Sequence, residues 1–194
     1  MKVLSYPNSV LSYKCKPIAV INQQLRDLVA AMFQVMYSSN GVGLAANQVG
    51  YPLQLFVMNE TGNSEKTENE YVLINPVISR RKGNQIDQEG CLSFPGVSAD
   101  VNRAKSIEIE SIAIDGSVQF FKWIDRQARI AQHEYDHLNG INFVDRLTES
   151  SLDEIRDDLD ELQINHENDI RLGFVLSDQE IQNQIAELEK QFCE

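Results

Sequence analysis

The segment His133-Glu134-Tyr135-Asp136-His137 constrains this chain more than any other part of its sequence. In an α-helix, residues four apart lie on one face about one turn apart, so both imidazoles can bind one metal ion with Glu134 beside them. A carboxylate next to metal-activated water can act as general base and then as general acid. The pattern therefore predicts metal-assisted hydrolysis and leaves the bond that is cleaved open.

Two histidines on a helix can also be ordinary polar surface. The chain has three histidines, and the third, His166, lies outside the motif. Because two of the three histidines lie at the spacing of metal ligands, the metal site is the favoured interpretation. A catalytic site of this kind needs a third protein ligand and one open coordination position, so another segment must supply that ligand.

Length and composition allow one substantial core, with room for an appendage: the chain has 194 residues, of which 42% are hydrophobic. It has no apolar run of membrane-spanning length, and residues 1–7 lack the charged-then-apolar build of a signal peptide. We therefore expect a soluble, cytoplasmic protein without membrane association. Cys15, Cys91 and Cys193 are too few and too scattered for a disulfide framework, which fits a reducing compartment.

The net charge of −12 is concentrated near the C-terminus. Residues 148–194 contain 14 acidic and 3 basic residues, a net of −11, which leaves −1 for residues 1–147. Neither part has the basic patch of a nucleic-acid-binding protein, so we expect no direct nucleic-acid binding. The division predicts a catalytic domain at 1–147 and an acidic helical extension at 148–194.

The periodicity predicts an α+β fold. One helix should begin at the cap Asn22, with a buried stripe made of Leu25, Leu28, Val29, Met32 and Met36. Strands are expected at 53–58, at 71–74 with Pro76 closing the strand, at 107–114 and at 118–123, and the metal helix between the cap Asp125 and Gly140. Few helices and several hairpins indicate antiparallel sheets around a central metal-binding helix, with C-terminal helices.

Two further segments contain candidate site residues. Gly41-Val42-Gly43 precedes a lone side-chain amide at Gln48, and such a glycine-rich segment is either a flexible loop or one that approaches a substrate. Cys91 follows a glycine and precedes a Pro-Gly turn, which favours an exposed loop or a strand end. A thiolate with two imidazoles would complete a three-ligand site; the alternative is a small buried hydrophobe, our interpretation of the other two cysteines.

Three segments, 41–48, 89–93 and 132–140, resemble the three signature motifs of the peptide deformylases in order and spacing. The resemblance covers about residues 2–147. It implies hydrolysis of the formyl group from the N-terminal formyl-methionine of newly made proteins. It also implies one divalent metal ion, commonly Fe2+ in the cell and often Zn2+ or Ni2+ in preparations.

The resemblance assigns roles to particular residues. It implies Cys91, His133 and His137 as metal ligands, Glu134 as general base and acid, and Gln48 with the backbone amide of Leu92 as donors to the developing oxyanion; Gly41, Val42, Gly43, Arg126 and Ile130 would bind substrate. An amide side chain and a backbone N–H are the donor types that an oxyanion needs. The Gly41–Gly43 segment would meet the peptide backbone in a strand-like manner.

Three positions depart from the family pattern. Asn47 stands where the family often has proline, and we expect a looser backbone just before Gln48. Arg126 and Gln127 replace an apolar pair that helps line the pocket for the methionine side chain. Seven residues of helix bring Arg126 back to the direction of His133, so it should face the pocket. It would either change side-chain preference or form an ion pair with Asp125, Asp87 or a carboxylate of the tail.

The extension after residue 147 is longer and more acidic than the family needs. Its charge argues against the basic C-terminal helix through which some members approach ribosomal RNA, so any ribosome contact would be of another kind. Capping-box patterns at Ser151 and Ser177 predict two helices joined near 165–173. Their apolar stripes, Leu152, Ile155, Leu159 and Leu162 in one and Ile181, Ile185, Leu188 and Phe192 in the other, should pack on the chain's own core, with a partner or dimer surface as the alternative.

Two alternatives to the deformylase function remain. In a zinc-type metalloprotease, Glu161 would replace Cys91 as third ligand. In a metal-dependent partner-binding protein the site would be vestigial. The first leaves two of the three motifs unexplained, and the second leaves no use for Glu134 together with Gln48.

Overall fold

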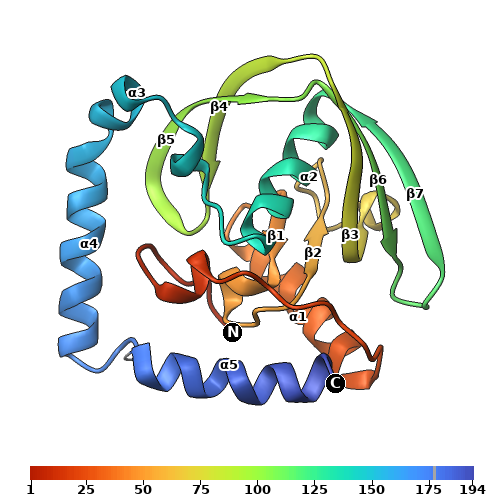
Figure 1. The fold of residues 1–194 in the computed structure, drawn as a ribbon, viewed down its shortest axis with the longest axis horizontal. Helices are drawn as coiled ribbons and strands as arrows, with labels where there is room; N and C mark the ends of the chain where they lie inside the picture. The colour runs from red at the N-terminus through yellow and green to blue at the C-terminus, as the bar shows by residue number, and fades with distance from the viewer. Residues whose placement is uncertain (177) are drawn as a thin grey trace.

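The computed structural model describes residues 1–176 and 178–194, and it has the predicted α+β architecture. The larger antiparallel sheet has the strand order β1 (Gly43–Ala45), β2 (Leu55–Met58), β3 (Tyr71–Lys82), β6 (Ser106–Ile112) and β7 (Val118–Ile124). The smaller sheet pairs β4 (Gln85–Cys91) with β5 (Phe94–Arg103). Helix α2 (Asp125–Leu138) lies at the centre of the molecule, between the two sheets (Figure 1).

The larger sheet is covered by a helix on each face because its side chains alternate. In β2, Leu55 and Val57 pack in the cluster that contains α1 (Gln23–Ser38), whereas Phe56 and Met58 pack in the cluster that contains α2. All four side chains are fully buried. Successive residues of a strand point to opposite faces, so an uninterrupted apolar run is what a doubly covered strand requires.

Helix α1 agrees with its prediction, whereas the start of α2 does not. The side chain of Asn22 accepts from the amide of Leu25, as expected of an N-cap. Asp125 was predicted to cap α2, but it is the first helical residue, has φ 48°, and makes no side-chain capping bond. Its amide instead donates to the carbonyl of Lys105, the residue just before β6, which ties the helix start to that end of the strand. The helix ends as predicted before Gly140, which has φ 70°.

Strand β3 extends well beyond its predicted limit, to Lys82, whereas β2 begins two residues later and β6 ends two residues earlier than predicted. Pro76 does not close β3, because Asn75 has φ 50° and the pairing with β6 shifts register between Ile74 and Val77. Proline is tolerated at such an irregularity, since no ladder bond is needed there. Strand β1, expected as loop, and the β4–β5 hairpin were not predicted. Both strands of that hairpin carry polar and glycine residues that mask a strand pattern.

The acidic extension forms three helical segments where two were predicted: α3 (Glu149–Glu154), α4 (Arg156–Arg171) and α5 (Asp178–Phe192). Thr148, not Ser151, caps α3, because the Thr148 hydroxyl accepts from the Ser151 amide. The predicted junction at 165–173 is also wrong, since α4 continues to Arg171. The predicted cap Ser177 lies outside the described residues.

The extension packs on the rest of the chain, as expected from its apolar stripes. Ile155 lies in a cluster with Phe94 and Phe143, and Phe192 is 2% exposed in the α1 cluster. In Figure 1, α4 stands beside the small sheet and α5 runs below the N-terminal segment. In the described part of the chain, no helix is both long and apolar enough to cross a membrane.

Candidate metal centre

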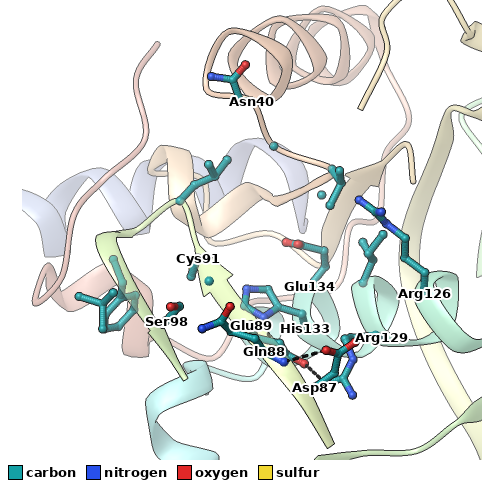
Figure 2. Close-up of a pocket in the computed structure, with 18 of the residues that line it drawn as sticks. Asn40, Asp87, Gln88, Glu89, Cys91, Ser98, Arg126, Arg129, His133 and Glu134 are labelled. Atoms are coloured by element: carbon teal, nitrogen blue, oxygen red, sulfur yellow. Dashed lines mark hydrogen bonds and ion pairs between the residues drawn. The ribbon is translucent and has the colours of Figure 1, made fainter. Parts of the chain in front are cut away.

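Cys91, His133 and His137 converge although they come from two separate elements. Cys91 is the last residue of β4, and the two histidines lie one turn apart on α2. One ligand atom from each lies within 4.8 Å of the others, and Cys91 Sγ is 3.3 Å from His137 Nε2. Figure 2 shows Cys91 beside the α2 side chains His133 and Glu134, to their left in this view.

This geometry fits a tetrahedrally bound ion. With metal–sulfur and metal–nitrogen bonds of about 2.3 and 2.0 Å, a sulfur and a nitrogen of one tetrahedron lie about 3.5 Å apart. The sulfur and the His137 nitrogen, 3.3 Å apart, are close to that separation. Thiolate and imidazole suit divalent iron, zinc and nickel. The three residues present therefore fit a single divalent metal ion.

Glu89 holds the first histidine ligand in place. Its Oε2 lies 3.0 Å from His133 Nδ1, which leaves His133 Nε2 for the metal. Arg103 and Arg129 bind the same carboxylate, at 2.9 Å and 2.6 Å. Although burial alone would raise the pKa of Glu89, its bonds to His133 and Arg103 lower it. Glu89 therefore stays ionised and orients the imidazole, as carboxylates behind metal-bound histidines do.

The electrostatics differ between the two histidines. Burial disfavours the charged form of both, but bonds to Cys91 and Glu89 raise the pKa of His133 well above its usual value. Burial and the nearby His133 lower the pKa of His137 well below its usual value. The cluster thus favours positive charge beside Cys91, and a divalent cation would replace the proton on His133.

Glu134 lies beside the ligands with one oxygen unused. Its side chain is 4% exposed, and Oε2 has no hydrogen-bond partner among the described residues. Burial raises the pKa of Glu134 to about 7. A carboxylate with a pKa near neutrality can both accept and return a proton.

Gln48 is held as an amide donor. Its Oε1 accepts from the Ala45 amide at 2.9 Å, and its Nε2 lies 3.3 Å from Cys91 Sγ and 3.2 Å from Ser93 Oγ. The amide group is thereby oriented with its N–H side toward the metal ligands. Leu92 follows Cys91 in the turn between β4 and β5 and lines the same cavity.

Asn47 does not loosen this segment, contrary to the expectation from the missing proline. Its side chain is fully buried, and Nδ2 donates to the His137 carbonyl at 2.7 Å. The bond fastens the segment that carries Gln48 to the end of the metal helix.

Most of the predicted site residues line one cavity of about 850 Å³, including the predicted substrate-binding residues Gly41, Val42, Gly43, Arg126 and Ile130. His137 is fully buried and lies behind the cavity. Arg126 points across the cavity from the start of α2 (Figure 2). The structure gives Arg126 no ion pair with any described carboxylate, and Asp125 instead lies 3.9 Å from Lys105.

The competing third ligand is not in this cluster. Glu161 is exposed on α4, and the described residues contain one group of ligands close enough to bind a metal, Cys91 with the two histidines. Cys15 is 3% exposed, in agreement with its interpretation as a small core residue. The three described cysteines are all free.

Sequence reasoning missed the residues that support the ligands. Ser93 is fully buried beside Gln48, and no role was predicted for it although it lies in the segment 89–93. Arg103 binds both Glu89 and Asp136, and Arg146 binds Asp136 on its other side. No local pattern marks Arg103, because its partners lie on different elements far along the chain.

Comparisons with known proteins agree with this site. The family model of polypeptide deformylases matches residues 1–153. A chloroplastic/mitochondrial peptide deformylase 1B from Arabidopsis thaliana is 42% identical over 86% of this chain and 61% of its own length. A peptide deformylase from Rhodopirellula baltica is 35% identical over 99% of this chain and 95% of its own length. The chain thus spans less than two thirds of the plant relative and nearly all of the bacterial one.

Solved structures of peptide deformylases also match this chain. The crystal structure of a plant peptide deformylase PDF1B matches with a TM-score of 0.84 and 42% identity, covering 87% of this chain and 91% of that one. The structure of a peptide deformylase from Thermus thermophilus matches with a TM-score of 0.79 and 35% identity, covering 85% and 99%. These matches cover the part of the chain that contains the metal centre.

Proposed function

Because this chain belongs to the peptide deformylase family, we propose that it hydrolyses the N-terminal formyl group of newly made formyl-methionyl peptides and releases formate. The observation that carries the proposal is the convergence of Cys91, His133 and His137 beside Glu134 and Gln48. Metal ligands, proton carrier and oxyanion donor are the parts that hydrolysis of an unreactive amide requires.

Cys91, His133 and His137 would hold one divalent ion, and we propose Fe2+ as the ion in the cell. Such an ion supplies activation of water and polarisation of the formyl carbonyl at neutral pH. The donor set equally accommodates Zn2+ or Ni2+ in preparations. Metal analysis of protein purified without oxygen tests this choice: iron at one equivalent is the expected result, and zinc alone would contradict it.

The chain's own residues would carry out the remaining steps. Glu134 would accept a proton from the attacking water and deliver it to the amine nitrogen as the formyl carbon–nitrogen bond breaks. Gln48 Nε2 and the Leu92 amide would donate to the formyl oxygen as it becomes negative. One such donor contributes about 3 kcal/mol to transition-state stabilisation.

The segment Gly41–Gly43 would bind the peptide backbone. Gly43 begins β1, which lies at the edge of the larger sheet and pairs with β2 along one side. The segment Gly41–Gly43 also lines the cavity. An edge strand can pair with an extended peptide through main-chain hydrogen bonds. Arg126 and Ile130 would then contact the first side chain of the peptide.

One assay separates this function from the alternatives. Formate release from formyl-Met-Ala-Ser is measured beside casein hydrolysis for the wild type, Cys91→Ala and the control Cys193→Ala. We expect formate release in the wild type and Cys193→Ala, its loss in Cys91→Ala, and no casein cleavage. Casein cleavage that survives Cys91→Ala would favour a metalloprotease, and metal binding without either activity would favour a vestigial site.

We propose that residues 148–194 are an extension of the catalytic domain 1–147 and that the protein works in the cytoplasm. The burial of Ile155 and Phe192 against the rest of the chain supports the first point. The free cysteines are consistent with a reducing compartment. The acidic charge of the extension makes the extension unsuited to direct contact with ribosomal RNA. The substrates of the enzyme would therefore reach the active site as emerging peptides.

A further inference from the structure

We propose that a second cavity, beside α2 and away from the metal centre, binds a phosphate group. This cavity has a volume of about 630 Å³. Gln132 and Asp136 line it from α2. Neither His133 nor Glu134 lines it, whereas both line the substrate cavity. The helix therefore separates two distinct cavities.

The charge of this cavity is opposite to that of the protein. Arg81, Arg103 and Arg146 line it together with one carboxylate, Asp136, in a chain of net charge −12. Arg103 also binds the buried carboxylate of Glu89, which lies outside the cavity, so three cations face two carboxylates and one positive charge is in surplus. Arg103 and Arg146 both bind Asp136, so its charge is already shared between them. The positive charge that remains is available for a ligand.

Arg81 is the cation without a carboxylate partner. Within the described residues it forms no ion pair, and its guanidinium carbon lies 5.8 Å from the centre of the Tyr135 ring. Arg81 pairs in register with Ile107, whose side chain packs in the α2 cluster. Its side chain therefore lies on the helix side of β3, where Arg81 lines the cavity.

The donors present match a phosphate. Guanidinium groups offer paired N–H donors that match the oxygens of a phosphate. Asn84 and Asn102 also line the cavity. The surplus positive charge and these donors suit a phosphate group, either free inorganic phosphate or the phosphoryl group of a monoester. The proposal does not depend on the reaction at the metal centre.

The chain offers a matched control for Arg81. Arg80 is the preceding residue of β3, is also exposed, and pairs with Glu108 at 3.8 Å on the other side of the strand. Arg80→Ala and Arg81→Ala therefore change the net charge equally on one strand. Only the second removes a group from the cavity.

The test is calorimetric titration of the metal-loaded protein with sodium phosphate, at constant ionic strength set with sodium chloride. We expect one phosphate per chain in the wild type and in Arg80→Ala with the same dissociation constant. Arg81→Ala should bind about tenfold more weakly or worse, the loss typical of a hydrogen bond to a charged group. Arg81→Lys keeps the charge without the planar fork and should be intermediate.

Several outcomes overturn the proposal. Equal affinity in the wild type and Arg81→Ala would place the phosphate at the metal ion or elsewhere, and equal weakening in both alanine variants would reduce the effect to net charge. Absence of binding in the wild type overturns it directly. Glucose 6-phosphate, titrated in parallel, distinguishes the source: binding of phosphate alone indicates the free ion, and equal binding of the ester indicates a phosphoryl group on a larger molecule, both supporting the site.

Discussion

A β-carbon at Gly43 would lie 2.4 Å from Oε1 of Glu134 and 2.8 Å from its carboxyl carbon. Both distances are far below van der Waals contact, so the edge strand β1 can pass over Glu134 only because residue 43 has no side chain. Gly43 of the substrate segment and Glu134 of the metal helix thus pack directly against each other, although they are 91 positions apart in the sequence.

The first prediction follows from this contact. Gly43→Ala should displace the Glu134 carboxylate and lower kcat, and Glu134→Ala should lower kcat by about 10²- to 10⁴-fold, the usual contribution of a general acid–base group. Both variants should retain one metal ion, because neither residue is a ligand in this assignment. Formate release and metal content are measured on the same samples, and near-normal turnover by metal-loaded Glu134→Ala would contradict the role of Glu134.

The second prediction concerns the third metal ligand. Cys91→Ala should abolish tight metal binding, whereas Glu161→Ala should leave it nearly unchanged because Glu161 is exposed on α4. The measurement is metal content after dialysis against a weak chelator. Equal metal retention in the two variants would refute the assignment of Cys91.

The third prediction concerns the support of His133 by Glu89. Glu89→Gln should weaken metal binding by about 10- to 100-fold, the usual effect of removing a carboxylate behind a histidine ligand. It should also destabilise the fold, by up to about 3 to 5 kcal/mol, because the charge of buried Arg103 loses a partner. Metal competition titrations and chemical unfolding measure the two effects. Asp87→Asn, an exposed change on the same strand, serves as the control and should show neither effect.

The fourth prediction concerns side-chain preference. Arg126 lines the substrate cavity without an ion-pair partner among the described residues, so its charge should favour polar or acidic first side chains over methionine. Arg126→Leu should raise the ratio of kcat/KM for formyl-Met over formyl-Glu peptides. An unchanged ratio would show that Arg126 has no part in the pocket.

The fifth prediction concerns attachment of the extension at high pH. The Tyr13 hydroxyl donates to Glu189 on α5 at 2.7 Å, and this hydrogen bond, with burial, raises the pKa of Tyr13 to about 12 from 10.0. The neutral hydroxyl is the donor, so its contribution is complete below pH 10 and disappears as the pH rises to 12. Tyr13→Phe should therefore be less stable than the wild type at pH 9, with the difference shrinking between pH 10 and 12. Chemical unfolding at a series of pH values measures it, and a constant difference would contradict it.

Local spacing alone identified much of the chemistry. The four-residue interval between His133 and His137 places two ligands on one helix face whatever surrounds them, since helix geometry depends on the backbone. The turn residues after Cys91 likewise indicated a strand end, where the structure has it. Fold class followed from hairpin patterns, because alternation and turn residues are local features.

Tertiary structure decided what depends on distant partners. Arg103 meets Glu89 across the β4–β5 hairpin and Asp136 on α2. Asn47 was expected to loosen its segment, yet its amide reaches the His137 carbonyl at 2.7 Å. The sequence by itself placed His133, Glu134 and His137 together on one helix, because that needs only local periodicity, whereas Cys91 was implied only by the family resemblance. The orientation of the ligands, the need for glycine at position 43 and the arginine-lined cavity arise only when separate elements pack together.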